Sequence, residues 1–309
     1  MESLRTSQLQ LVAGIAFGSV GLLWLLRRLT LRRKISGLQG QVVLITGASS
    51  GVGEACAHAF YKAGSRVILC ARRVNELERV KNELISLDLT TTTHPPHVLP
   101  LDLEDLEGIP AKAAEALALN DGGVDILINN GGMGFRGTVL ETELSVQQKV
   151  MKVNYFGSVA LTKALLPSMI AKGGGHIVAL SSVQGKFAIP FRSAYAASKH
   201  AMQAFFECLR AEMAQHSVLV TIISPGYIKT NYSYNAVTAD GTPHGEMDAT
   251  IASGMSTDYV AERILHSIVK RQPDVIIAPL YLRLLIYIKA FLPSLYAWVM
   301  ALRARGSSK

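Results

Sequence analysis

Residues 41–53 read QVVLITGASSGVG, a short apolar run that leads directly into a turn with three glycines, Gly47, Gly51 and Gly53. The run is rich in β-branched residues and apolar on both faces, which predicts a strand buried in a parallel sheet. Glycines between a strand and a helix let backbone N–H groups approach a pyrophosphate, where the helix dipole favours an anion. No Gly-Lys-Ser/Thr follows, so the turn is not a P-loop. A tight turn without a ligand is the alternative. If the turn binds a dinucleotide, the candidate residues are Gly47, Ser49, Ser50, Gly51, Val52 and Gly53.

The rest of the chain repeats this alternation of strand and helix. Apolar strand patterns lie at 66–71, 98–101, 124–128, 176–180 and 218–223, and helical patterns lie near 74–87, 107–119, 146–170 and 191–216. Alternating units of this length predict an α/β fold, a Rossmann-type doubly wound parallel sheet in one domain at 35–279. Ligands of such sheets bind beyond the carboxyl ends of the strands, so the turn-rich stretch 226–254 is a candidate substrate cover.

The formal net charge of +8 lies at the two ends of the chain. Residues 1–34 carry a net +5, residues 280–309 carry +5 without an acid, and residues 35–279 carry a net −2. A nucleic-acid groove would place positive charge on the folded body, so no nucleic-acid partner is expected. The three cysteines form no CxxC pair, and no metal site is expected.

The N-terminal 34 residues are typical of a membrane anchor with a basic flank. The apolar run at 9–26 is interrupted only by Gln10 and Ser19, and about 18 residues is the lower limit for a bilayer-spanning helix. A signal peptide is the alternative, but here the basic residues follow the apolar run instead of preceding it. We therefore expect an uncleaved N-terminal transmembrane helix in the endoplasmic reticulum membrane, with the peroxisomal membrane second. The positive-inside rule favours a cytosolic domain over a lumenal one.

The C-terminal tail at 280–309 is apolar and basic, and two interpretations of it stay open. Pro279, Arg283, Lys289 and Pro293 interrupt the apolar stretch 275–302, which argues against a second span. One interpretation is a segment on the membrane surface with its aromatic residues in the interface. The other is a last strand and a tail that packs on the body or on a second copy of the chain, in a homodimer.

Two arginines, Arg72 and Arg73, follow the second predicted strand, where an NAD site would place a carboxylate for the ribose 2′-hydroxyl. Guanidinium groups form charge-assisted hydrogen bonds to a phosphate. The pair therefore predicts NADP(H) rather than NAD(H) as the cofactor, and a solvated basic pair is the alternative.

Tyr195 and Lys199 stand at i and i+4, on one face of a predicted helix. A neighbouring cation lowers the pKa of a phenol, which then exchanges a proton more readily near neutral pH. With ten tyrosines in the chain, a chance pair of this spacing is unremarkable, so its context matters. Ser182 follows the strand at 176–180 and could hold a carbonyl oxygen, and Asn154 is a polar residue inside an apolar helix. A turn-capping serine and a buried structural amide are the alternatives.

Taken in order, these residues resemble the motifs of the short-chain dehydrogenase/reductase family, over about residues 38–280. The ordered set is TGASSGVG at 46–53, Asp102-Leu103, Asn129-Asn130-Gly131-Gly132, Asn154, Ser182, Tyr195, Lys199, and Ser224-Pro225-Gly226 with Thr230. The family pattern after the fourth strand usually reads Asn-Asn-Ala-Gly. Gly131 departs from that pattern, and we expect it to loosen the turn.

The resemblance implies an enzyme that interconverts a carbonyl and an alcohol. Tyr195 would be the acid/base, Lys199 would lower its pKa and hold the nicotinamide ribose, and Ser182 would position the substrate carbonyl. Asn154 would support a water relay to Lys199. Further cofactor contacts are implied for Asp102, Leu103, Asn129 and Thr230. The resemblance extends to a membrane-anchored branch of the family, which implies a lipid-like substrate and acyl-dihydroxyacetone phosphate in particular.

The sequence thus predicts a membrane-anchored, NADP(H)-dependent oxidoreductase that acts on the CH–OH or C=O group of a lipid-like substrate. The alternative is a non-catalytic protein that kept the dinucleotide fold and acts through protein–protein contacts. The joint presence of Asn154, Ser182, Tyr195 and Lys199 argues against it, because a scaffold has no need for this set.

Overall fold

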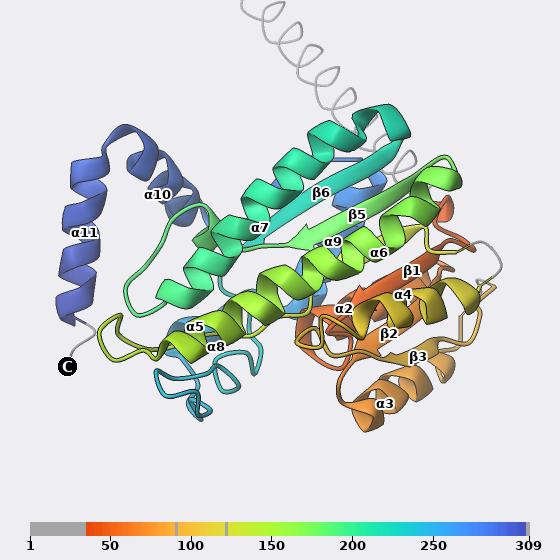
Figure 1. Ribbon diagram of the computed structural model, residues 1–309, viewed down its shortest axis with the longest axis horizontal. Coiled ribbons are helices and arrows are strands. Elements are labelled where there is room, and N and C mark those ends of the chain that lie inside the picture. The colour runs from red at the N-terminus through yellow and green to blue at the C-terminus, as the bar shows by residue number, and fades with distance from the viewer. Residues whose placement is uncertain (1–34, 90–91, 121–122, 307–309) are drawn as a thin grey trace, which may run out of the picture.

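The computed structural model describes residues 35–89, 92–120 and 123–306, in which one sheet is covered by helices on both faces (Figure 1). Seven parallel strands lie in the order β3-β2-β1-β4-β5-β6-β7. The strands are β1 Val42–Thr46, β2 Arg66–Ala71, β3 His97–Pro100, β4 Ile126–Asn129, β5 Gly175–Leu180, β6 Val218–Pro225 and β7 Asp274–Ile277. The helices are α2 Gly51–Lys62, α3 Val74–Ile85, α4 Ile109–Ala118, α5 Leu144–Met151, α6 Gly157–Ala171, α7 Ser193–Glu212, α8 Ala249–Ala252, α9 Thr257–Val269, α10 Leu280–Phe291 and α11 Pro293–Gly306.

Apolar residues alternate along β1 between two cores, because successive side chains of a strand point to opposite faces of the sheet. Val43 and Ile45 lie in the core formed with α2, α3 and α9. Val42 and Leu44 lie in the core formed with α4, α6 and α7. The sheet is therefore buried on both faces, which explains the continuous apolar runs. The doubly wound parallel sheet predicted from the sequence is confirmed.

The long helix predicted at 146–170 contains a π-helical turn. Helix α5 continues through the turn Lys152–Phe156 directly into α6. Such turns are rare and are frequently found at functional sites. The buried residue in this turn is Asn154, one of the candidate site residues.

The stretch 226–254, the candidate substrate cover, follows the carboxyl end of β6. Val237 forms a parallel bridge with Phe135, which follows β4. Both side chains are buried in a small cluster with Val146 of α5 and Ala194 of α7. This cluster fixes the stretch, which we call the cover loop, against the two helices.

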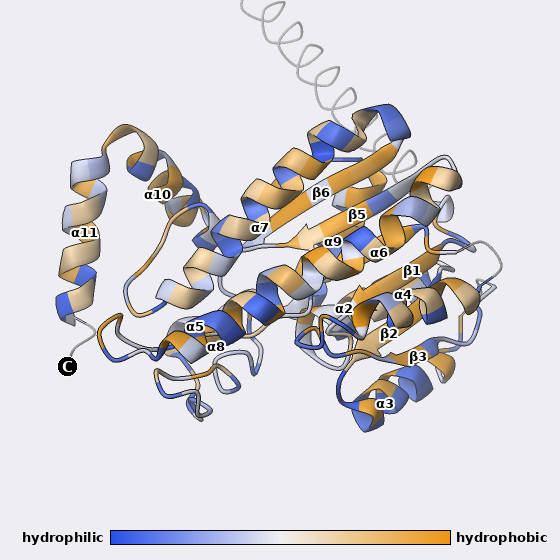
Figure 2. Ribbon diagram, in the orientation of Figure 1, coloured by the Kyte–Doolittle hydropathy of each residue, from blue (hydrophilic) through white to orange (hydrophobic). Residues whose placement is uncertain are grey.

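The C-terminal tail folds as two helices, α10 and α11 (Figure 1). Pro279 precedes α10 and Pro293 begins α11, positions at which proline does not disturb a helix. Leu282 of α10 is buried against Val183 and Phe187, so the tail packs on the segment that follows β5. Figure 2 shows apolar residues along much of α10.

Within the described residues, no helix is both long enough and apolar enough to cross a bilayer. The anchor predicted at 9–26 and its basic flank lie outside these residues.

Candidate active site

A cavity of about 970 Å³ opens at the carboxyl ends of the strands. It is lined from β1 and β2 on one side to β5 and the cover loop on the other. The sheet order reverses between β1 and β4, which makes this edge the topological switch point where ligands of doubly wound sheets bind.

The glycine-rich turn after β1 forms one wall of the cavity. Gly47 and Gly51 have φ angles of 68° and 62°, in the left-handed region that favours glycine. Gly51 lines the cavity together with Gly47, Ser49, Ser50 and Val52. Gly53 does not line it: a Cβ there would lie 2.2 Å from the Gly47 carbonyl oxygen. This third glycine instead allows α2 to pack closely on the turn.

The end of β4 is tied to the end of β1 by Asn130. Its side-chain amide donates to the Thr46 carbonyl oxygen at 2.8 Å, and its backbone N–H donates to Thr46 Oγ1 at 3.0 Å. Asn130 lines the cavity, whereas Asn129, which was expected to do so, is buried and donates to Thr162 Oγ1 at 2.9 Å. The alternation of strand side chains explains the correction, because adjacent residues point to opposite faces.

Gly131 packs tightly on its neighbours, although its departure from the family pattern predicted a looser turn. Its N–H donates to Thr46 Oγ1 at 2.8 Å, and a Cβ would lie 2.7 Å from Leu103 Cδ1. The expected loosening of this turn is therefore wrong, because the missing methyl group gives room to Leu103. Leu103 and Asp102 both line the cavity. The Asp102 carboxylate accepts from the Glu104 N–H at 2.9 Å.

Arg72 and Arg73 lie exposed on the lining of the cavity, at the end of β2. Arg73 Nη2 donates to the hydroxyl oxygens of Ser49 and Ser50, each at 3.1 Å. The guanidinium group is thereby fixed beside the glycine-rich turn, and Thr230 lies across the turn, 3.3 Å from the position of a Cβ on Gly51.

Tyr195, Ser182 and Lys199 come together at the cavity's other end. Ser182 follows β5, accepts from the Gln184 N–H at 3.1 Å and hydrogen bonds with Tyr195. Lys199 Nζ lies 5.8 Å from the centre of the Tyr195 ring and donates to the Leu180 carbonyl oxygen at 2.8 Å. Three residues far apart in the sequence thus meet at one point.

Burial dominates the proton affinities at this end. It raises the pKa of Tyr195 above its usual value, while hydrogen bonds with Ser182 and Tyr232 and the charge of Arg136 act to lower it. Burial also lowers the pKa of Lys199 to about 7. The groups that lower it are Ser182, Tyr232 and Arg136, and the lowering expected from Lys199 stays a prediction.

Asn154 does not line the cavity. It is fully buried in the π-helical turn, and its carboxamide accepts from the Met133 N–H at 2.7 Å and donates to the Met133 carbonyl at 3.0 Å. A further bond runs to Ser198 Oγ at 3.0 Å. The side chain therefore fixes Met133, which lines the cavity, and connects it to the helix that carries Tyr195 and Lys199.

Sequence reasoning missed an ion cluster in the cavity lining. Arg136 and Arg192 both bind the same oxygen of Asp248, at 3.2 and 3.3 Å. Tyr232 lies beside them, with its ring centre 6.0 Å from that of Tyr195. These residues are separated by tens of positions in the sequence and belong to no short motif, so spacing gave no signal for them.

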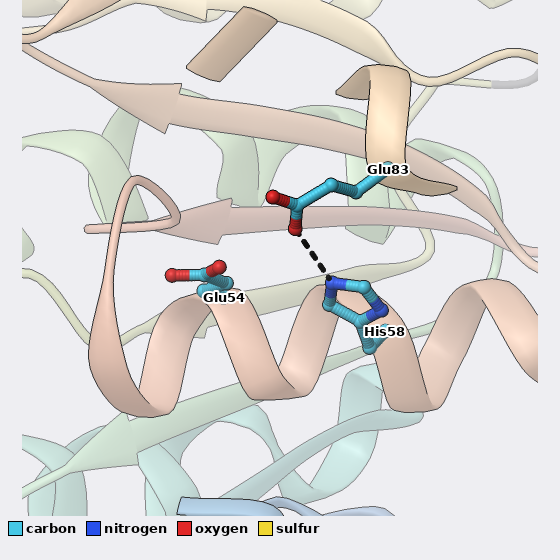
Figure 3. Close-up of side chains that lie close together, drawn as sticks. All are labelled: Glu54, His58 and Glu83. Carbon is cyan, nitrogen blue, oxygen red and sulfur yellow. Dashed lines mark ion pairs between the residues drawn. The ribbon is translucent and has the colours of Figure 1, made fainter. Parts of the chain in front are cut away.

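A group of possible metal ligands lies on α2 and α3, with Glu54 on the cavity lining. Glu54, His58 and Glu83 point toward one another, and His58 Nε2 lies 3.7 Å from a Glu83 oxygen (Figure 3). Arg79 binds Glu54 at 2.9 Å and Glu83 at 2.8 Å. Since this guanidinium supplies the positive charge that both carboxylates need, the group forms an ion-pair network.

A glycine-rich turn at a switch point, with a tyrosine, a serine and a lysine across the cavity, is an arrangement typical of oxidoreductases that bind a dinucleotide. The family profile described as short chain dehydrogenase matches residues 41–240. The chain belongs to the short-chain dehydrogenase/reductase family.

Similar proteins cover most of the chain. A protein of Drosophila melanogaster named dehydrogenase/reductase SDR family protein 7-like is 57% identical over 267 residues, which is 86% of this chain and 81% of that protein. Dehydrogenase/reductase SDR family member 7B of Xenopus laevis is 48% identical over 96% of this chain and 91% of its own length. The crystal structure of a metagenomic short-chain oxidoreductase in complex with NADP is 28% identical, has a TM-score of 0.62 and is matched over 78% of this chain and 98% of that one.

Proposed function

We propose that the protein is an NADP(H)-dependent oxidoreductase that interconverts a carbonyl and an alcohol on a lipid-like substrate. One observation carries the proposal: a single cavity has Tyr195, Ser182 and Lys199 at one end and the exposed pair Arg72 and Arg73 at the other. The first group can exchange a proton with a carbonyl oxygen, and the second can bind a phosphate.

The residues present fit a dinucleotide. The turn with Gly47 and Gly51 in left-handed conformations leads into the N-terminus of α2, where backbone N–H groups favour a pyrophosphate. Arg73, fixed by Ser49 and Ser50, stands where a ribose 2′-phosphate would be bound, and a similar metagenomic enzyme binds NADP. When bound, a nicotinamide cofactor supplies the hydride for the carbonyl carbon. We propose Asp102, Leu103, Lys199 and Thr230 as its other contacts, with Asn130 in place of Asn129.

The proton side of the reaction follows from the chain's own residues. Because burial keeps the Tyr195 pKa above its usual value, the phenol is protonated at neutral pH and can transfer its proton to the substrate oxygen. Ser182 accepts from the Gln184 N–H, and its own hydroxyl proton, which is directed at Tyr195 without substrate, can be donated to the same oxygen when the substrate binds. Lys199 Nζ, held by the Leu180 carbonyl, can stabilise the phenolate that forms. Asn154 acts through its hold on Met133 rather than on the reacting atoms.

The exposed apolar side chains of the C-terminal helices support the proposal that the substrate comes from a membrane. Side chains of α10 and α11 are strongly exposed, among them Leu280 at 70%, Phe291 at 78% and Trp298 at 60%. Arg303 of α11 lines the cavity, so this apolar surface borders the entrance. We propose that these helices lie on the bilayer of the endoplasmic reticulum, on the side of the cytosol, and that acyl-dihydroxyacetone phosphate is the candidate substrate. Protease protection of the folded domain in sealed microsomes would contradict the cytosolic placement.

A substrate screen tests the proposed reaction. Purified full-length enzyme in mixed micelles is expected to oxidise NADPH with at least one of a panel of acyl-dihydroxyacetone phosphates, retinals and steroid ketones. The Tyr195→Phe variant should bind NADPH but lose turnover, because the ring is kept and only the proton donor is removed. If the wild type consumes no NADPH with any of these carbonyls, a non-catalytic role is favoured.

A further inference from the structure

The end of the cavity proposed to bind the cofactor phosphate is lined by acids as well as by arginines. The charged residues that α2, α3 and the segments after β2 and β3 contribute to the lining are Arg72, Arg73, Arg79, Glu54, Glu76 and Asp102. Acids and arginines are equal in number, so this end attracts a phosphate only where an arginine is not neutralised by one of the acids. How the acids and arginines pair therefore decides how strongly a phosphate is bound.

Arg79 of α3 binds both glutamates of this lining and a third glutamate outside it. Its Nε lies 2.9 Å from Glu76, and its Nη1 lies 2.9 Å from Glu54 and 2.8 Å from Glu83. Glu54 belongs to α2, and Glu83 lies one turn further along α3, where it also faces His58 (Figure 3). One guanidinium thus gathers the carboxylates that lie between the two helices.

Arg73, in contrast, is engaged only by neutral groups. Its Nη2 contacts the hydroxyl oxygens of Ser49 and Ser50, and within the part of the chain that the structure describes it forms no ion pair. Glu76 is only three positions further along the chain, a spacing that makes side chains neighbours on a helix surface. Its carboxylate nevertheless pairs with Arg79, which is three positions further on again. The positive charge of Arg73 is therefore left for a ligand.

We propose that Arg79 sets the preference for NADP(H) by holding Glu76 away from Arg73, so that Arg73 can bind the ribose 2′-phosphate. Without Arg79, the Glu76 carboxylate would turn to Arg73, neutralise its guanidinium and repel the phosphate. NADH has a hydroxyl group in place of this phosphate and would be affected little. Arg79 is a positioning residue in this account, because it acts through Glu76 and Arg73. The assignment rests on the proposed function, which takes NADP(H) as the cofactor.

Two other roles of Arg79 lead to different results. If Arg79 only ties α3 to α2, its loss would weaken NADPH and NADH alike, since both cofactors contact the turn that begins α2. If Arg79 binds the phosphate directly, its loss would weaken NADPH, but removal of the Glu76 charge would not restore the affinity. The two cofactors and the Glu76 variant together separate these roles.

Cofactor titrations test the proposal without requiring turnover. Purified full-length enzyme in mixed micelles is titrated with NADPH and with NADH, and the ratio of the two dissociation constants measures the preference. Arg79→Gln should lower the preference for NADPH about 3- to 10-fold, because an exposed ion pair between Glu76 and Arg73 is weak but acts together with repulsion of the phosphate. The affinity for NADH should change by less than about 2-fold.

A second substitution tests whether Glu76 carries the effect. Adding Glu76→Gln to Arg79→Gln should return the preference to within about 2-fold of the wild type, because the two residues are coupled and the competitor of the phosphate has been removed. Arg79→Lys keeps the positive charge but lacks the fork of donors, so it should lower the preference by a smaller factor that Glu76→Gln also reverses. This conservative variant carries the test if Arg79→Gln does not fold.

Lys81→Gln is the matched control. Lys81 lies on the same helix and binds Glu78 at 3.4 Å, and neither residue lines the cavity. The substitution therefore removes the same charge and also releases a glutamate, but away from the phosphate. The preference for NADPH should stay as in the wild type.

Three results would overturn the proposal. They are an unchanged preference in Arg79→Gln, an equal weakening of NADPH and NADH, and a failure of Glu76→Gln to restore the preference. If Arg73→Ala abolishes the preference and Arg79→Gln does not change it, the role of Arg79 fails and the proposed cofactor stands. If the wild type binds NADPH and NADH equally tightly, the proposed cofactor preference fails as well.

Discussion

Replacing Arg73 by alanine should weaken NADPH binding far more than NADH binding. Arg73 is exposed, and its Nη2 contacts Ser49 and Ser50 at 3.1 Å each. Loss of these two bonds affects the turn, and hence both cofactors, to a similar degree. Only NADPH also loses the attraction between the guanidinium and its 2′-phosphate. The ratio of the two dissociation constants therefore isolates the phosphate contact.

The size of the effect follows from the exposure of Arg73. A hydrogen bond to a charged group contributes about 1.5–3 kcal/mol, and solvent screening of an exposed side chain reduces this to about 1–2 kcal/mol. That is about a 5- to 30-fold rise in the Kd of NADPH relative to that of NADH. Arg72→Ala should act in the same direction, and the double variant should lose most of the discrimination.

Cofactor fluorescence titrations at fixed ionic strength measure both dissociation constants. Lys149→Gln controls for the change in net charge and should leave the ratio as in the wild type. An equal rise of both dissociation constants in Arg73→Ala would refute the phosphate contact, since it would show that the arginine only supports the turn.

Three further substitutions test the account at buried residues. Lys199→Met should raise the melting temperature at pH 7, because the lysine's pKa is about 7 when folded and 10.5 otherwise. Between pH 7 and pH 10.5 the unfolded chain therefore binds more protons than the folded chain. The wild type loses stability as the pH falls from 10.5 to 7. The gain, about 4 kcal/mol at pH 7 for these two pKa values, should vanish near pH 10.5, and a gain independent of pH would contradict this reasoning. Gly53→Ala should destabilise the fold severely, because its Cβ would lie 2.2 Å from the Gly47 carbonyl oxygen. In Gly131→Ala the Cβ would lie 2.7 Å from Leu103 Cδ1, at the end of a side chain that can shift. This variant should lower the free energy of unfolding by less than about 1.5 kcal/mol. Chemical denaturation measures the stability of both variants. A Gly131→Ala variant less stable than Gly53→Ala would contradict the packing described around these two glycines.

The fold could be predicted from the sequence because the central strands are buried on both faces. Runs such as residues 67–71 are apolar throughout, and this pattern survives in any arrangement that keeps the sheet covered. The Tyr195–Lys199 pair could likewise be placed, because the i, i+4 spacing fixes one helix face. Motifs within one element are therefore accessible to sequence reasoning.

Contacts between elements were not accessible in the same way. The choice between Asn129 and Asn130 depends on which face of β4 each residue occupies, and a shift of one position reverses it. Arg136, Arg192 and Asp248 meet only after the cover loop has folded over the strands. The raised pKa of Tyr195 also depends on burial that no spacing reveals.

The central claim is that Tyr195 gives the proton in a carbonyl reduction that uses NADPH. The most direct test follows NADPH oxidation together with alcohol product, using hexadecanoyl-dihydroxyacetone phosphate in mixed micelles. The wild type should form one alcohol for each NADPH consumed, and Tyr195→Phe should bind NADPH with unchanged affinity but turn over at least about 100-fold more slowly. Turnover by Tyr195→Phe at the rate of the wild type would contradict the account.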